Sequence, residues 1–174
     1  LRNIFIMVGN IPNFTKMDIL RCFLRFQKNT GRQEIAKDLE LGEGTVRTVL
    51  EILKSKKLLD STKKGHFLSK KGGEVLNQIY GAISPPKNLS VQHIYPSLKK
   101  IGVIVRNASN PRELYKLRDI AVKSGADGAL ILKFENRLYA PESGYEQDYK
   151  ELEKSFNFKN GDILIVAFSN DKRN

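Results

Sequence analysis

The stretch from Gly31 to Leu59, GRQEIAKDLELGEGTVRTVLEILKSKKLL, decides the fold of the N-terminal half of the chain. Its apolar residues recur at helical spacing, which predicts two helices, over residues 33–39 and 45–57. Between them lies a tight turn, in which Gly42 supplies the positive φ that a sharp reversal needs. The second helix has a polar face opposite its buried stripe, a layout typical of a DNA-reading helix-turn-helix. The buried stripe consists of Val46, Val49, Leu50 and Leu53.

A β-hairpin and a further helix are predicted directly after this stretch. Residues 58–62 and 66–68 have the composition of two short strands, and the basic turn Lys63-Lys64-Gly65 joins them. The next helix opens near Ser69, and an upstream helix runs from an N-cap at Thr15 to about residue 28. The predicted order is therefore helix, helix, turn, helix, hairpin, helix.

The region from Leu41 to Gly73 resembles the winged-helix domains of prokaryotic transcription regulators. The resemblance is carried by LGEGTVRTVL at 41–50, KKLL at 56–59, Gly65 in the wing, and Leu68-Ser69-x-x-Gly72 at the exit from the wing. It implies a winged helix-turn-helix domain that binds double-stranded DNA and reads the major groove.

Basic and polar side chains of this region are the candidate DNA contacts. We expect Arg47 to reach a base or a phosphate, and the alternative is a salt bridge to Glu51 one turn further on. Thr45 has an alternative role as the helix N-cap, whereas Thr48 faces outward. The full set of expected DNA-binding residues is Arg32, Gln33, Thr45, Arg47, Thr48, Lys63, Lys64 and His66.

The net charge of +11 favours a polyanionic partner such as DNA. The excess is denser around the helix-turn-helix, because residues 15–83 carry 14 Lys and Arg against 8 Asp and Glu, whereas residues 84–174 carry 15 against 11. The alternative interpretation is a basic solvated surface without a nucleic-acid partner.

The composition also favours a cytoplasmic protein. No apolar run approaches the roughly 20 residues that a membrane span needs, so no membrane partner is expected. The single cysteine, Cys22, excludes an internal disulfide, fits a reducing compartment and lies in apolar surroundings typical of a core residue. The stretch Leu1–Val8 is an arm, an added strand or, with Met7 as the true start, a reading artefact.

The first helix has two apolar stripes on nearly opposite sides. The stripe expected to face the core consists of Met17, Leu20, Phe23 and Leu24. The other stripe consists of Ile19, Cys22 and Phe26. The second stripe needs a partner, which is the C-terminal domain, the Leu1–Val8 arm or another subunit. Together with a broad apolar face over residues 73–83, it favours a homodimer.

A second domain follows the helix-breaking pair Pro85-Pro86, which gives domains over 1–84 and 85–174. One of its helices is expected to begin at Asn110 and end at Gly125, and the other to begin at Ser143. The predicted order is β-α-β-β-α-β, preceded by a short strand. This order indicates an α+β fold, a small two-layer α/β sandwich with both helices on one face of the sheet.

The second domain resembles the C-terminal domain of a family of uncharacterised archaeal proteins that carry an N-terminal winged helix. The matching segments are GVIVR at 102–106, LRDIAVKSGADGA at 117–129 and GDILI at 161–165. The resemblance implies an archaeal protein similar to winged-helix transcriptional regulators, with an α+β domain at its C-terminus.

The sequence has no catalytic constellation and no metal-binding pattern. Its two histidines lie in different domains, neither has a cysteine or carboxylate at ligand spacing, and there is no glycine-rich phosphate loop. We therefore expect no enzyme activity, no cofactor and no bound metal.

Polar residues of the second domain form a candidate effector site, because an Arg beside carboxylates in a partly desolvated cleft binds small polar or anionic ligands. The candidate residues are Arg106, Arg118, Asp119 and Asp127. In the alternative, these are surface charges and Arg106 pairs with Asp127 or Glu135 for stability alone.

Together these patterns predict a DNA-binding transcription regulator whose C-terminal domain senses a small molecule or mediates assembly. The alternative function is a winged-helix scaffold for protein or RNA contact, without sequence-specific DNA binding.

Overall fold

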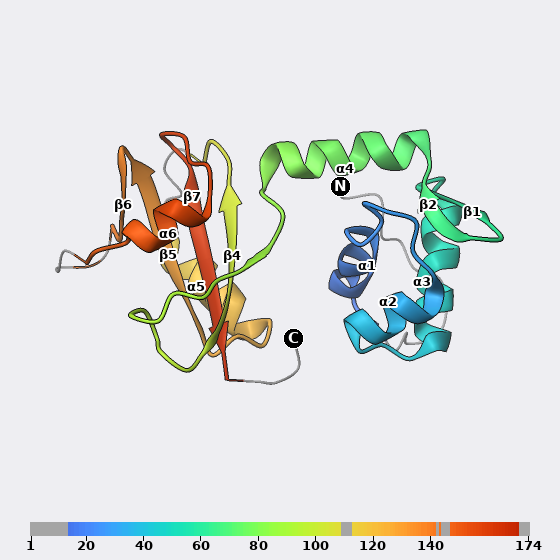
Figure 1. The fold of residues 1–174 in the computed structure, drawn as a ribbon, viewed down its shortest axis with the longest axis horizontal. Helices are drawn as coiled ribbons and strands as arrows, with labels where there is room; N and C mark the ends of the chain where they lie inside the picture. The colour runs from blue at the N-terminus through green and yellow to red at the C-terminus, as the bar shows by residue number, and fades with distance from the viewer. Residues whose placement is uncertain (1–13, 109–112, 142, 144–146, 171–174) are drawn as a thin grey trace. The chain divides into compact units, whose positions relative to one another are not determined.

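A computed structural model of the chain describes residues 14–108, 113–141, 143 and 147–170. The chain divides into two compact units, and the division falls between Gln78 and Ile79. Figure 1 shows helices and a small hairpin in the first unit and a larger sheet with helices in the second. Among the described helices, none is long and apolar enough to cross a membrane.

The first unit has helices followed by a two-stranded antiparallel hairpin and the start of a long helix. Its elements are α1 (Lys16–Phe23), α2 (Arg32–Leu39), α3 (Glu43–Ser55), β1 (Leu59–Thr62), β2 (Gly65–Leu68) and α4 (Lys70–Ala82). Thr15 is the N-cap of α1, as its sequence indicates, and forms a capping box with Asp18.

The core of the first unit contains the apolar stripe expected for α3, whose four residues are all buried. The expectation for α1 was correct only in part. Phe23 of the expected core stripe is buried, but Met17 is 57% exposed, and Ile19, Cys22 and Phe26 of the other stripe are buried as well. Both stripes of α1 have helical spacing, so periodicity could not tell which one faces inward. The stripe that seemed to need another subunit is therefore buried within its own unit.

The turn between α2 and α3 differs from the expected one. Gly42 has φ −60° and is the N-cap of α3, whereas Glu40 takes the left-handed conformation with φ 54°. The amide of Leu41 donates to the carbonyl of Ala36 at 3.0 Å, so the left-handed residue ends α2 instead of forming the middle of the turn. Helix α3 consequently begins at Glu43, and Thr45 lies in its first turn, not at its N-cap.

The motif Leu68-Ser69-x-x-Gly72 joins the start of α4 to the end of α3. The Ser69 hydroxyl accepts a hydrogen bond from the Gly72 amide at 3.0 Å and donates to the Lys57 carbonyl at 2.6 Å. A Cβ on Gly72 would lie 2.0 Å from the carbonyl oxygen of Leu58, so only glycine fits this approach of α4 to the chain after α3.

The second unit is built on a five-stranded sheet in which all neighbours are antiparallel, in the order β3-β4-β7-β5-β6. Its elements are β3 (Lys87–Asn88), β4 (Lys99–Val105), α5 (Leu114–Lys123), β5 (Gly128–Glu135), β6 (Arg137–Tyr139), α6 (Lys150–Ser155) and β7 (Ile163–Ser169). The molecule is thus a mixed α+β protein, with helices at its N-terminal end and a sheet after them.

Both faces of this sheet are covered. Leu114 of α5 packs with Ala129 and Ile163 on one face, whereas Leu152 of α6 packs with Leu164 on the other. Figure 1 shows α5 behind the sheet and α6 in front of it. The expectation of a two-layer sandwich with both helices on one face was therefore wrong. Alternating residues of β5 and β7 are apolar on both sides, so each face needs its own cover.

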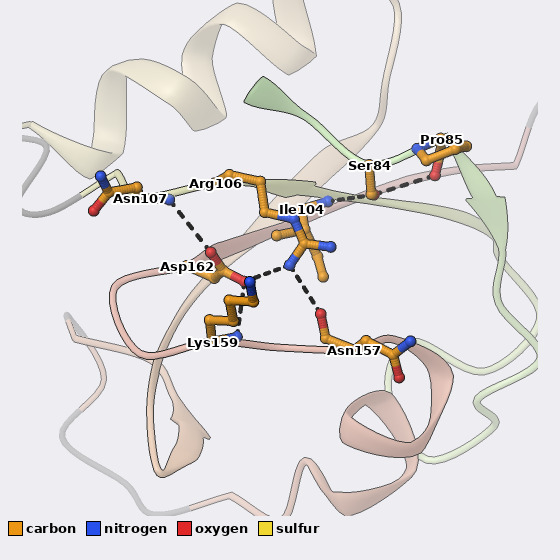
Figure 2. Close-up of polar contacts among 8 residues, drawn as sticks. All are labelled: Ser84, Pro85, Ile104, Arg106, Asn107, Asn157, Lys159 and Asp162. Atoms are coloured by element: carbon orange, nitrogen blue, oxygen red, sulfur yellow. Dashed lines mark hydrogen bonds and ion pairs between the residues drawn. The ribbon is translucent and has the colours of Figure 1, made fainter. Parts of the chain in front are cut away.

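The chain around the Pro85-Pro86 pair is attached to the sheet and does not form a free linker. Ala82 accepts a hydrogen bond from the Arg106 amide at 2.8 Å. The Ser84 amide donates to the Ile104 carbonyl at 2.8 Å, and its hydroxyl accepts from the Ile104 amide at 2.9 Å (Figure 2). These bonds explain why the last turn of α4 belongs to the second unit. The boundary between the units therefore lies before Ile79, whereas the sequence placed it after residue 84.

Of the two expected helix starts in the second unit, only Ser143 lies among the described residues. Asn110 and the stretch Leu1–Val8 lie outside the described residues. The helix that ends near Gly125 is α5, and Gly125 follows it with φ 103°. The expectation of a helix start at Ser143 was wrong, because α6 begins at Lys150 and has Tyr149 as its N-cap residue.

Candidate nucleic-acid interface

The basic hairpin turn is fixed to the start of α2. Thr62 pairs with Gly65, which leaves Lys63 and Lys64 exposed at the tip. One residue pair away from this tip, the His66 and Thr30 backbones exchange two hydrogen bonds, each of 3.1 Å. Gly65 has φ 123°, and a Cβ there would meet the Thr30 carbonyl oxygen at 3.0 Å. The hairpin is therefore held beside Thr30, and the next residue, Gly31, is the N-cap of α2.

The outward face of α3 carries Arg47, Thr48 and Glu51, all exposed. The Arg47 Nε donates to Glu51 Oε1 at 3.2 Å, with the two side chains 71% and 64% exposed. The Thr48 hydroxyl donates to the Gly44 carbonyl at 3.2 Å. The salt bridge foreseen as the alternative role of Arg47 is thus formed. An exposed pair of this kind contributes only about 0.3–0.5 kcal/mol, so Arg47 can exchange Glu51 for another partner.

The start of α2 lies beside the start of α3. Arg32 and Gln33 are exposed in the first turn of α2, and Arg32 Nη2 lies 3.0 Å from Glu43 Oε2. This contact joins the two helices through side chains that are about half exposed. Of the expected residues on α3, Thr45 is half-buried, which limits how much of its side chain a ligand can contact.

His66 occupies a partly buried position among these elements. Its Nδ1 is buried and, within the described part of the chain, has no hydrogen-bond partner. Burial lowers the pKa of His66 below its usual value, and the positive charges of Lys54 and Arg32 lower it further. The sequence reasoning missed Lys54. It lies seven residues after Arg47 on the same helix, a spacing that places both on one side of α3.

The first unit thus brings together most of its candidate residues. The charges of Arg32 from α2 and Lys54 from α3 both lower the pKa of His66 in β2, and Arg32 pairs with Glu43 at the start of α3. Lys63 and Lys64 extend from the same hairpin as His66. The arrangement offers exposed cations and hydroxyls to an anionic ligand along α3, the start of α2 and the hairpin.

Two of the four candidate effector residues of the second unit, Arg106 and Asp127, lie far apart. Arg106 lies beside Asp162 just before β7 begins, whereas the Asp127 amide bonds to the Phe168 carbonyl near the end of β7. Positions 162 and 168 are six residue steps apart along the strand, a distance of about 20 Å. Arg118 and Asp119 are exposed on α5. Arg106 and Asp127 therefore do not belong to one site, because the antiparallel register places them at opposite ends of β7.

Asp162 explains the position of Arg106 (Figure 2). The buried carboxylate of Asp162 accepts from Arg106 Nη1 at 2.5 Å and from the Lys159 amide at 2.9 Å. It also accepts from the Asn107 amide at 3.3 Å, and Arg106 donates further to the Asn157 carbonyl at 2.8 Å. The partner of Arg106 is thus neither Asp127 nor Glu135, and the network ties the end of β4 to the loop before β7.

A cavity of about 740 Å³ lies elsewhere in the second unit. Its polar lining residues include Glu135, Arg137, Tyr139, Lys150 and Glu153. None of the four candidate effector residues lines it. Among the described residues, no group of three or more His, Cys, Asp or Glu could hold a metal ion.

Comparisons with known proteins match both halves of the chain. The family model described as "PH0730-like, N-terminal domain" matches residues 15–74, and "Domain of unknown function (DUF4443)" matches residues 97–174. The chain is similar to the solved structure of the hypothetical protein PH0730 from Pyrococcus horikoshii OT3, with 31% identity and a TM-score of 0.77. The similarity covers 92% of this chain and 86% of that one. Among curated proteins, none matches significantly.

Proposed function

The chain belongs to the family of the Pyrococcus horikoshii protein PH0730, and we propose that the first unit of this chain is a winged helix-turn-helix that binds double-stranded DNA. The names of the family and of its domains state no activity, so the proposal is argued from the geometry of the first unit. In this proposal α3 enters the major groove and the β1–β2 hairpin is the wing. The protein acts as a cytoplasmic transcription regulator.

One observation carries this proposal, namely the fixed position of the basic hairpin relative to α2 and α3. The paired backbone bonds between Thr30 and His66 hold the hairpin, and Arg32 reaches Glu43 at the start of α3. A rigid arrangement of this kind favours DNA binding, because phosphate contacts fix the register in which a helix meets the bases.

Each exposed group has a role in the proposed complex. Arg47 and Thr48 contact base edges or phosphates from α3, and Lys63 and Lys64 contact the backbone beside the groove. Glu51 competes with DNA for Arg47, since the two side chains pair in the free protein. The start of α2, with Arg32 and Gln33, contacts a neighbouring phosphate.

The second unit is proposed to bind a small effector or to mediate assembly of a homodimer. Its cavity of about 740 Å³ lies within the size range of small-molecule sites, roughly 300–1,000 Å³. For assembly, the support from the second α1 stripe is lost, because that stripe faces the core of its own unit. The remaining support is the half-buried apolar face of α4, formed by Val75, Ile79 and Tyr80.

A second candidate function is a winged-helix scaffold for protein or RNA contact. The observation that favours it is the pairing of Arg32 and Arg47 with Glu43 and Glu51, which places carboxylates where phosphates would be repelled. The two functions differ in their dependence on salt and on duplex DNA.

Titration of the full-length chain with mixed-sequence duplex DNA tests the proposal. At about 50 mM salt, we expect binding at micromolar concentrations that weakens steeply as salt rises, because counterions are released from the phosphates. Arg47→Ala should weaken binding to a selected preferred site by roughly 1–3 kcal/mol. Glu51→Gln is the matched variant and should strengthen binding, since it frees Arg47 and removes a negative charge. If no duplex binds even at tens of micromolar protein, DNA binding is refuted and the scaffold function is favoured.

A further inference from the structure

The exposed face of α3 has most of its side-chain hydrogen-bond donors already in use. The Thr48 hydroxyl donates to the Gly44 carbonyl at 3.2 Å, and the Ser55 hydroxyl donates to the Ile52 carbonyl at 2.8 Å. Both hydroxyl hydrogens are thus used within the helix itself. Of the exposed residues of α3, only Arg47 has side-chain N–H groups to offer a ligand.

The guanidinium of Arg47 is held along one edge only. Its Nε donates to Glu51 Oε1 at 3.2 Å, across one turn of the helix. Within the described part of the chain, neither Nη group of Arg47 has a partner, and Glu51 Oε2 has none either. The pair therefore presents the open fork of the guanidinium, formed by Nη1 and Nη2, while Glu51 occupies the Nε edge.

A guanidinium fork of this kind matches one base in particular. In the major groove, guanine presents two neighbouring acceptors, O6 and N7, whereas adenine and thymine present one acceptor each and cytosine presents an amino donor. The two Nη groups of an arginine can donate to O6 and N7 together, and this contact leaves Nε with its carboxylate. The Arg47–Glu51 pair can therefore stay intact while Arg47 holds a guanine.

We infer that Arg47 reads a guanine through its two Nη groups, and that Glu51 is the positioning residue that keeps Arg47 on this base. This rests on the proposed function, because it names the base that one residue of the same surface recognises. Glu51 competes with phosphates for Arg47, but it does not compete with guanine, since the base and the carboxylate use different N–H groups of the guanidinium.

The charge of Glu51 increases the difference between right and wrong sequences. If Arg47 turns away to a phosphate or to another base, the Glu51 carboxylate is left unpaired beside the negatively charged DNA. The pair is weak in the free protein because water screens both charges, and it strengthens where the groove excludes water. Sequences without the guanine are therefore penalised more than those that have it.

Glu43 provides a matched carboxylate on the same helix. It pairs with Arg32 at 3.0 Å, and both side chains are about half exposed. In the proposed complex Arg32 contacts a phosphate, and every DNA sequence presents phosphates. Removing the charge of Glu43 should therefore change the affinity for all sequences alike, whereas removing the charge of Glu51 should change the discrimination between them.

The first experiment selects bound duplexes from a random library with the full-length wild type, Arg47→Ala, Glu51→Gln and Glu43→Gln. We expect the wild-type site to contain a guanine whose enrichment disappears in Arg47→Ala. Glu51→Gln should bind a mixed-sequence duplex more tightly and prefer this guanine less. Glu43→Gln should also bind more tightly, but with an unchanged preference. The substituted side chains are all exposed, and circular dichroism of each variant checks that its fold is retained.

The second experiment changes the guanine itself. Replacing its G·C pair by A·T should weaken wild-type binding by about 5- to 150-fold, the factor that corresponds to one bidentate contact. In Glu51→Gln this factor should be smaller. Replacing the guanine by 7-deazaguanine, which still pairs with cytosine but lacks the N7 acceptor, should weaken wild-type binding as well. Arg47→Ala should bind the guanine and 7-deazaguanine duplexes equally.

The outcomes separate this inference from the proposed function. If duplexes bind but the library yields no preferred sequence, or Arg47→Ala keeps every guanine preference of the wild type, guanine reading is refuted and DNA binding stands. If Glu51→Gln discriminates as strongly as the wild type, the positioning role of Glu51 is refuted. If no duplex binds at all, the inference and the proposed function fall together.

Discussion

Gly72 lies so close to the Leu58 carbonyl that its position has no room for a side chain. The neighbouring Gly73 lies in the same helix, α4, and has no atom within 4 Å of a Cβ built on it, whereas the Cβ of residue 72 would overlap the Leu58 carbonyl. The two glycines therefore have the same helical backbone, and the only difference between them is the space available for a side chain.

Gly72→Ala should destabilise the protein by about 1–3 kcal/mol, because α4 must move away from the end of α3 to admit the methyl group. Gly73→Ala should instead be neutral or stabilising by up to about 1 kcal/mol, since alanine is the better helix former. Urea unfolding of the two variants measures the difference. Equal stabilities for both would show that the close approach to Leu58 does not constrain α4.

Asp162 stabilises the second unit through its buried carboxylate, which holds Arg106 and the backbone amides of Asn107 and Lys159. Asp162→Asn keeps the shape but removes the charge, so we expect a loss of about 1.5–3 kcal/mol, the usual worth of hydrogen bonds to charged groups. Asp119→Asn, at an exposed position of α5, should cost less than about 0.5 kcal/mol. Thermal or urea unfolding compares them, and wild-type stability of Asp162→Asn would contradict the role of the network.

The proposed wing is the β1–β2 hairpin, and its tip carries two exposed lysines. Lys63 and Lys64 form the tip of the hairpin and touch no other element through a described hydrogen bond of their side chains. Replacing both with Ala should weaken binding to every duplex and reduce the salt slope by about 1.8, because each phosphate that a lysine neutralises adds about 0.9 to that slope. Lys116 and Lys123 on α5 supply the control, in which the slope should not change. An unaltered slope in the hairpin variant would exclude the wing from the interface.

Helix spacing was sufficient to predict the elements of the first unit but not all of their orientations. The stripe of α3 could be predicted because its opposite face is polar. For α1, Met17 and Ile19 begin two apolar stripes of helical spacing, and only tertiary packing decides that Ile19 is buried and Met17 exposed. The left-handed residue between α2 and α3 was also mispredicted, because Glu40 takes the conformation that was expected of Gly42.

Sequence alone could predict which candidate site residues come together only where those residues are close in the chain. Residues of α2, α3 and the hairpin are close in sequence, so local structure suffices to gather most of them. The effector candidates lie on segments whose proximity depends on strand register, and this register places Asp127 about 20 Å from Arg106. Asp162, the true partner of Arg106, is 56 residues away in the chain, and no local pattern indicates that pairing.

Assembly into a homodimer remains a prediction for the whole molecule, and the reason for it is the spacing of half-sites on DNA. If the first unit binds DNA as proposed, a single α3 of 13 residues would cover one half-site, whereas a symmetric dimer would place two such helices on half-sites about 34 Å apart. The apolar surface that such a dimer would use is not the Ile19, Cys22 and Phe26 stripe, which is buried within the first unit. The half-buried face of α4 is the remaining candidate from the sequence.

Light scattering at high micromolar concentration should therefore give twice the 19.8 kDa mass of the chain. A dimer should also bind a duplex of about 24 base pairs far more tightly than one of about 12, because only the longer duplex holds two half-sites one helical turn apart. A monomer would gain only the few-fold advantage of having more sites on the longer duplex. A monomeric mass together with that small gain would mean that one winged helix binds DNA alone, and α4 would then have no role in assembly.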